Sequence, residues 1–315
     1  VDASPGDARP PSKRGGGSLG LKSSAPSGST EFLHENGTFE RVEKGTVSLD
    51  NGIHYTGQWR CNRRDGHGVQ EWADGARFDG QWRDGVAEGH GKFVHADGDI
   101  YEGEWKDDKA NGEGTYHHVD GSKYCGEWRN DQKEGTATEE WADNSRFEGQ
   151  YVGGKKHGTG KFTWPEGSSY SGAFENNVMH GEGTYRWHDG RVFTGQWRNN
   201  RMNGTGTFTW CDGRHYVGGY MDDKKHGEGV FTWPDGSEYH GDWWGGMRHG
   251  QGVVKTLKGG LRSGEWRENV RIRWLDEGGA VDKEAASPDL GRAGARDPDA
   301  QNISISRVSA ETCGV

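Results

Sequence analysis

The chain has 315 residues and a formal net charge of −10, with 56 glycines, 15 tryptophans, 10 tyrosines and 10 phenylalanines. Leu, Ile, Val and Phe together supply only 41 residues, and no leucine occurs between Leu49 and Leu257. A segment of this kind cannot build the aliphatic core of a helical bundle or a doubly wound α/β fold. The acidic balance disfavours nucleic-acid binding. No apolar run approaches the roughly 18 residues that a transmembrane helix needs.

Residues 1–38 open the chain with runs of Gly, Ser and Pro, such as Gly15-Gly16-Gly17. Segments of this composition cannot bury enough apolar surface to fold. The first 38 residues are therefore predicted to form a disordered arm.

A segment with the pattern aromatic–x–Gly–x–aromatic then recurs every 23 residues without insertion or deletion. The nine copies start at Tyr55, Phe78, Tyr101, Tyr124, Phe147, Tyr170, Phe193, Tyr216 and Tyr239. Arg262 starts a tenth copy, and Gly45–Leu49 reads as the second half of a leading one. A repeat this regular predicts a stack of identical units, each packed on its neighbours.

The spacing within a copy favours strands over helices. Tyr101, Gly103 and Trp105 are two residues apart and share one face of a strand, which places Glu102 and Glu104 on the opposite, solvated face. Glycine at this density also disfavours a helix. We expect each glycine to leave room for an aromatic ring from the neighbouring strand.

Most copies close with an Asp-Gly pair, as at Asp97-Gly98 and Asp235-Gly236. This dipeptide is typical of a type I′ hairpin turn, in which both central residues have positive φ. Each copy is therefore predicted to be a two-stranded hairpin. The fold class predicted for residues 39–275 is all-β, an elongated single-layer antiparallel β-meander.

The pattern Tyr239-His-Gly-Asp-Trp243, followed by Arg248-His249-Gly250-Gln-Gly252, resembles the MORN (membrane occupation and recognition nexus) repeat. Departures from that pattern are Tyr151, Phe174 and Tyr220 in place of Trp, and a weakened fourth copy with Glu134, Ala137 and Glu139. The resemblance implies a scaffold in a cytoskeletal, ciliary or membrane-junction assembly. The four cysteines form no CxxC pair and have no regular spacing, which is typical of reduced thiols in a cytosolic protein. We therefore expect a cytoplasmic location, with association to the cytoskeleton, a cilium or a membrane surface.

After Leu275 the composition turns to Ala, Gly, Asp and Pro, so residues 276–315 are predicted to form a disordered tail. A short capping helix there is an alternative, because the last strand of an open sheet needs its edge covered.

No motif predicts catalysis, a cofactor or a metal site, and we expect a protein that is not an enzyme. The many Gly-x-Gly fragments lack the Gly-x-x-x-x-Gly-Lys-Ser/Thr pattern of phosphate loops. Four histidines share one repeat position, but adjacent copies lie about 10 Å apart, too far for one zinc ion. They are His157, His180, His226 and His249.

The first function hypothesis is a scaffold that binds a helix or an extended segment of a partner protein on the ring-lined face. Aromatic side chains are enriched at such interfaces. The candidate residues lie in the richest stretch of rings and are Trp164, Trp187, Trp210 and Trp233. The terminal strands could also pair edge to edge and give an end-to-end homodimer.

The alternative is a peripheral membrane module that binds anionic phospholipid (phosphoinositide) headgroups through basic hairpin turns. The candidate residues for this contact occupy the same hairpin turn of their copies, and both members of each pair are expected to face one edge of the sheet. They are Arg63, Arg64, Lys155, Lys156, Lys224 and Lys225. The three pairs are three and four copies apart, roughly 30 and 40 Å, which exceeds the ~8 Å screening length at physiological salt. The sequence therefore predicts weak, local lipid contact at most.

Overall fold

The computed structural model describes residues 40–276. The predicted arm of residues 1–38 lies outside the described residues, and so does the predicted tail apart from its first residue, Asp276. The chain divides into two compact units, whose described parts are residues 40–156 and 157–276.

The described residues form 21 β-strands and one 3₁₀ turn, η2 (Asp50–Gly52). The strands of the first unit are β1(Val42–Ser48), β2(His54–Arg60), β3(Arg63–Glu71), β4(Arg77–Arg83), β5(Val86–Val94), β6(Ile100–Lys106), β7(Lys109–His117), β8(Lys123–Arg129), β9(Gln132–Glu140) and β10(Arg146–Val152). β11(Lys155–Thr163) contains the boundary. The second unit continues with β12(Ser169–Glu175), β13(Val178–Arg186), β14(Val192–Arg198), β15(Arg201–Thr209), β16(His215–Met221), β17(Lys224–Thr232), β18(Glu238–Trp244), β19(Met247–Lys255), β20(Leu261–Arg267) and β21(Val270–Trp274).

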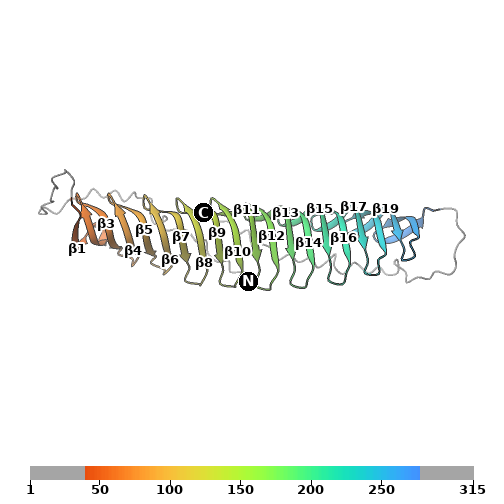
Figure 1. Ribbon diagram of the computed structural model, residues 1–315, viewed down its shortest axis with the longest axis horizontal. Helices are drawn as coiled ribbons and strands as arrows, with labels where there is room; N and C mark the ends of the chain where they lie inside the picture. Colours follow the sequence, from red (N-terminus) through yellow and green to blue (C-terminus); the bar gives the residue numbers. More distant parts are fainter. Residues whose placement is uncertain (1–39, 277–315) are drawn as a thin grey trace. The chain divides into compact units, whose positions relative to one another are not determined.

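Within each unit, every strand pairs with the next strand along the chain in antiparallel orientation (Figure 1). The register follows the repeat. Tyr101 lies opposite Tyr116 and Gly103 opposite Gly114 on β6 and β7, and Gly114 in turn lies opposite Gly126 on β8. The predicted all-β antiparallel meander is confirmed, and β1 pairs with β2 where the sequence predicts the second half of a leading copy.

Aromatic rings occupy the space above the repeat glycines, as the sequence predicts. A methyl group placed on Gly114 would come within 2.4 Å of the Tyr101 hydroxyl oxygen and 2.6 Å of its Cζ atom. The Tyr101 side chain is fully buried and donates a hydrogen bond to the Glu104 carbonyl oxygen (3.0 Å). The Trp128 ring packs edge-on against it at 5.3 Å. Burial of a ring contributes several kcal/mol at about 25 cal/mol per Å², which offsets the entropy cost of the glycines.

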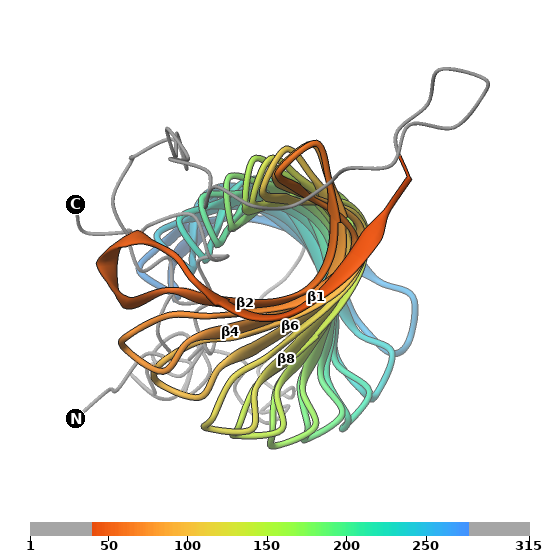
Figure 2. The same ribbon diagram turned by 90° about the vertical axis from the view of Figure 1, so that its left-hand side faces the viewer.

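Bulges interrupt the two-residue hairpins, as between β6 and β7. On β7 the three residues 111–113 lie opposite Glu104 alone, and Gly112 has a φ of 88°, a conformation that favours glycine. Bulges increase the local bend and twist of a strand. Figure 2 looks along the first unit from β1 and shows the strands bent around one side of the sheet.

The turn prediction was wrong. The two-residue turns are formed by pairs such as Asp107-Asp108, with φ of 50° and 62°, whereas Asp120-Gly121 lies in a five-residue connection in which only Gly121 has positive φ. The Asp120 carboxylate accepts a hydrogen bond from the Ser122 amide (2.7 Å), two residues further on. This local bond to the backbone selects a longer loop over a type I′ turn.

Candidate protein-binding surface

The four candidate tryptophans pack among other rings of the repeat. Trp187 lies 4.4 Å from the ring of Tyr185 and 5.2 Å from that of Phe208, and only 5% of its surface is exposed. Trp164 and Trp210 are buried in the same way, and Trp233 is half-buried against Phe231. The ring-lined face is therefore mostly covered by its own side chains. Protein binding by these four residues stays a prediction.

These tryptophans also begin the five-residue loops. The Trp187 amide donates to the Arg191 carbonyl oxygen, and the Gly190 amide donates to the Trp187 carbonyl oxygen (both 3.0 Å). The Arg191 guanidinium lies over the Trp187 ring at 5.3 Å. The loop thus closes over the ring and helps to bury it.

Of the six candidate basic residues, Arg63, Lys155 and Lys224 are exposed at strand starts, immediately after the two-residue turns. The second residue of each pair points instead to the ring-lined face. Arg64 is buried, lies 4.1 Å from the Trp82 ring centroid, and bonds to Gln70 and to the Gly85 carbonyl oxygen. Burial lowers the pKa of Arg64 to about 10. The expectation that both members of each pair face one edge of the sheet is wrong.

Lys225 lies within four rings. Its ammonium is 5.1 Å from the ring centroid of Trp210, 5.6 Å from Tyr216, 4.8 Å from Phe231 and 4.9 Å from Trp243. Cation–π attraction stabilises a charge in such surroundings. The side chain is 7% exposed, so it offers little to a lipid headgroup in this conformation.

The fourth copy replaces an aromatic residue with a buried ionic cluster. Glu139 stands where most other copies have a ring, and it bonds to Lys133 and to the Tyr151 hydroxyl. The positive charges of Lys133 and Lys156 outweigh burial and hold the pKa of Glu139 below its usual value. Burial lowers the pKa of Lys156 to about 8, and its ammonium lies 4.7 Å from the Trp141 ring centroid.

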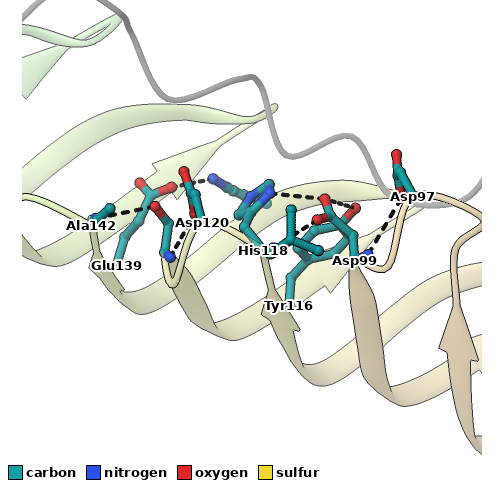
Figure 3. A network of polar contacts seen from close by, with 10 residues as sticks. Asp97, Asp99, Tyr116, His118, Asp120, Glu139 and Ala142 are labelled. Carbon is teal, nitrogen blue, oxygen red and sulfur yellow. Dashed lines mark hydrogen bonds and ion pairs between the residues drawn. The ribbon is translucent and has the colours of Figure 1, made fainter.

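Figure 3 shows the polar contacts that continue from this cluster toward β6. The Asp99 carboxylate accepts a hydrogen bond from the Tyr116 hydroxyl (3.0 Å) and contacts His118 Nδ1 (2.9 Å). Its other oxygen accepts from the Val119 amide (3.0 Å). Burial and the negative charge of Asp99 raise the pKa of Tyr116. Asp99 thereby fixes the following loop to the sheet, which is a structural role.

The opposite face of the sheet carries the solvated side chains, as predicted for Glu102 and Glu104. We call it the polar face. Side chains at the middle of successive strands form a row across the polar face, which we call the central row. This row differs between the two units. In the first unit the row includes the charged residues Asp79, Lys92 and Glu102, which are successive cross-strand partners. In the second unit the row begins with Lys161 and Ser171, and it then holds uncharged side chains except for a histidine, from strand to strand Thr184, Thr194, Thr207, Val217, Val230, His240, Val253 and Ser263.

The polar face of the second unit is hollowed over β17–β20 by an open cavity of about 540 Å³. Val230, Val253 and Leu275 give it an apolar lining, and Glu228 and Asp242 give it two carboxylates. The sequence reasoning missed this surface because it followed the aromatic positions. Comparing, from copy to copy, the residue directly after each repeat's first ring, as Asp79 and Val217, and the residue directly before the ring of its second strand, as Lys92 and Val230, would have shown the change from charged to aliphatic.

The part of the chain from residue 40 to 276 holds no group of three or more His, Cys, Asp and Glu side chains placed to bind a metal ion. Over the same residues, no helix has the length and apolar character of a membrane span.

The chain belongs to the MORN repeat family. The family's repeat matches nine consecutive segments, at residues 55–77, 78–100, 101–123, 124–146, 147–169, 170–190, 193–213, 216–238 and 239–255. A search of curated proteins gave no match.

Among solved structures, the chain is similar to the TCP10 domain of Danio rerio CPAP in complex with a peptide of Danio rerio STIL. The two share 12% identity and a TM-score of 0.40 over 75% of this chain and 98% of that one. It is also similar to the TCP domain of Drosophila melanogaster SAS-4 in complex with a proline-rich motif of Ana2. That match has 12% identity and a TM-score of 0.31 over 48% of this chain and 83% of the other.

Proposed function

We propose that this protein is a non-enzymatic scaffold that binds partner proteins on the polar face of its second unit. The observation that carries the proposal is the central row of aliphatic and hydroxyl side chains from Thr184 to Ser263. In that row Val217 is 45% exposed, and no other described element covers it. Exposed aliphatic side chains in a continuous row are typical of interaction surfaces.

The ring-lined face contributes to this function indirectly. Rings that are seated on glycine and buried by their neighbours hold the strands in register, so the polar face is presented as a fixed array. The carboxylates of the cavity stand in an open site. General acid–base catalysis instead uses carboxyl groups whose pKa values are tuned by seclusion, which favours binding over catalysis.

Membership of the MORN repeat family supports a setting in a cytoskeletal, ciliary or membrane-junction assembly in the cytoplasm, which we propose as the finer assignment. The alternative of phosphoinositide binding stays a prediction. Its exposed candidates are Arg63, Lys155 and Lys224.

The scaffold proposal is tested by capturing partners from a lysate of the cells that make this protein. Val217→Arg places a charge on the polar face, and Lys224→Glu reverses a charge at the hairpin end of the next strand as a matched control. Both positions are exposed, so both variants should fold. We expect Val217→Arg to lose the bound proteins and Lys224→Glu to keep them. Retention of every partner by Val217→Arg would refute the proposal, and liposome sedimentation of Lys224→Glu tests the lipid alternative.

A further inference from the structure

The cavity on the polar face has a floor of bare backbone. Gly229 on β17, Gly241 on β18 and Gly252 on β19 are consecutive cross-strand partners, and all three line it. Their missing side chains face the ring-lined side, where the Tyr216 and Tyr239 rings fill the space, so the three glycines present only backbone on the polar face. The cavity can therefore admit a main chain as well as side chains.

Aliphatic side chains lie on either side of the centre of this floor. Val230 and Val253 both pair with His240, on its two neighbouring strands, and Leu275 stands at the rim with 38% of its surface exposed. The four strands β17–β20 span about 14 Å, which corresponds to about four residues of extended chain. The cavity has the size and lining for a short extended peptide.

The cavity also concentrates negative charge. Glu228 and Asp242 lie directly opposite each other on β17 and β18, an arrangement that is destabilising for like charges. Neither forms an ion pair with another residue in the described range 40–276.

Other carboxylates around the cavity differ in this respect. Glu238 contacts His240 at 2.7 Å and Lys255 at 3.2 Å, and Glu265 contacts Arg273 at 2.9 Å. The carboxylates without an ion pair are therefore centred on the cavity. The Asp242 carboxylate accepts a hydrogen bond from the Gln251 amide (3.1 Å), which leaves its negative charge in place. A cation from another molecule would relieve the repulsion between Glu228 and Asp242.

We propose that this cavity binds an extended segment of a partner protein in which a Lys or Arg side chain is flanked by aliphatic side chains. The cation lies between Glu228 and Asp242, and the aliphatic side chains contact Val230 and Val253. The inference rests on the proposed scaffold function and names the chemistry of the partner.

The chain's own C-terminal residues are a less complementary occupant. Residues 277–315 carry seven acidic and four basic side chains, so their net charge of −3 has the same sign as the cavity. The short stretch Ile303-Ser-Ile305-Ser-Arg307 is their best match to the proposed motif. The test therefore includes Arg307.

The experiment measures fluorescence anisotropy of a labelled eight-residue peptide of alternating valine and arginine, added to the full chain. The key variant is Glu228→Lys. Its matched control is Glu182→Lys, because Glu182 is exposed at the same repeat position two copies earlier and does not line the cavity. We expect Glu228→Lys to weaken binding at least about tenfold, the effect of about 1.4 kcal/mol, and Glu182→Lys to change it less than about twofold.

Three results would overturn the inference: equal losses in the two variants, equal binding of a peptide of alternating valine and glutamate, or tighter binding by Arg307→Glu. The last result would show that the chain's own C-terminal segment occupies the cavity. If Glu228→Lys keeps its affinity for the arginine peptide, the inference fails. The scaffold proposal is still judged separately by partner capture with Val217→Arg. Circular dichroism of each variant confirms that the strands are retained.

Discussion

Gly114→Ala tests the seating of rings on glycine. The added methyl group would meet Tyr101 at 2.4–2.7 Å, at its hydroxyl oxygen, Cζ and Cε2 atoms. Gly114 does not have a positive φ, so the substitution adds no backbone strain and its effect comes from the ring. Because Tyr101 is fully buried among other rings, it cannot move aside without disturbing its neighbours.

The expected cost follows from three contributions. Overpacking costs about 1–3 kcal/mol, and loss of the hydrogen bond from Tyr101 to the Glu104 carbonyl oxygen costs about 0.5–1.5 kcal/mol. Replacing glycine returns about 0.4–1 kcal/mol by restricting the unfolded chain. The net loss in the free energy of unfolding should be about 2 kcal/mol, within a range of about 0.5–4 kcal/mol.

Urea unfolding followed by tryptophan fluorescence measures this loss, with hydrogen exchange of β6 and β7 amides as a local readout because repeat arrays need not unfold in one step. Gly45→Ala is the control, since a methyl group there meets nothing within 4 Å and φ is not positive. The cost of Gly114→Ala should nearly vanish when Tyr101 is replaced by leucine. An equal cost in the presence and absence of the Tyr101 ring would refute the reasoning.

Three further substitutions test other features. Asp108→Ala should lower the free energy of unfolding by about 2–3 kcal/mol, because it loses the hydrogen bond from the Ala87 amide (2.7 Å) and places alanine at a φ of 62°. Asp107→Ala is the control and should cost only the backbone strain of about 1–2 kcal/mol. Equal costs of the two substitutions in thermal melts would contradict this prediction. Lys225→Ala should destabilise by about 2–4 kcal/mol through the cavity it leaves among four rings, and Lys225→Met by less than about 1.5 kcal/mol. The pKa of Lys156 is about 8 in the folded protein and 10.5 in the unfolded chain. Between pH 8 and pH 10.5 the unfolded chain therefore binds more protons, and the free energy of unfolding rises with pH by at most about 1.4 kcal/mol per pH unit. Urea midpoints of the wild type relative to Lys156→Met should show this rise, and parallel profiles would exclude it.

The sequence predicted the strands and which side chains lie on each face of the sheet. A two-residue spacing within a 23-residue repeat fits few other folds. Tyr101 over Gly114 could be expected from the pairing of rings with glycines alone. The turn type could not be predicted from the sequence. Whether an Asp-Gly pair forms a type I′ turn or a five-residue loop depends on whether the Asp side chain bonds to the backbone nearby, as Asp120 does.

The burial of Arg64 and Lys225 was missed because charged residues beside a turn are usually solvated. A signal was present in the neighbouring copies, where the same repeat position holds Ala87, Ala110 and Met202, all buried. The cavity depends on strand curvature and on which carboxylates find partners, and neither can be read from composition or spacing.

Hydroxyl-radical footprinting of the full chain, alone and with a partner bound, compares the two faces of the second unit directly. Binding on the polar face should protect Val217, Val230 and Val253 and leave the reactivity of Trp187 and Trp210 unchanged. Protection of the tryptophans with the valines still reactive would place the partner on the ring-lined face and contradict the account.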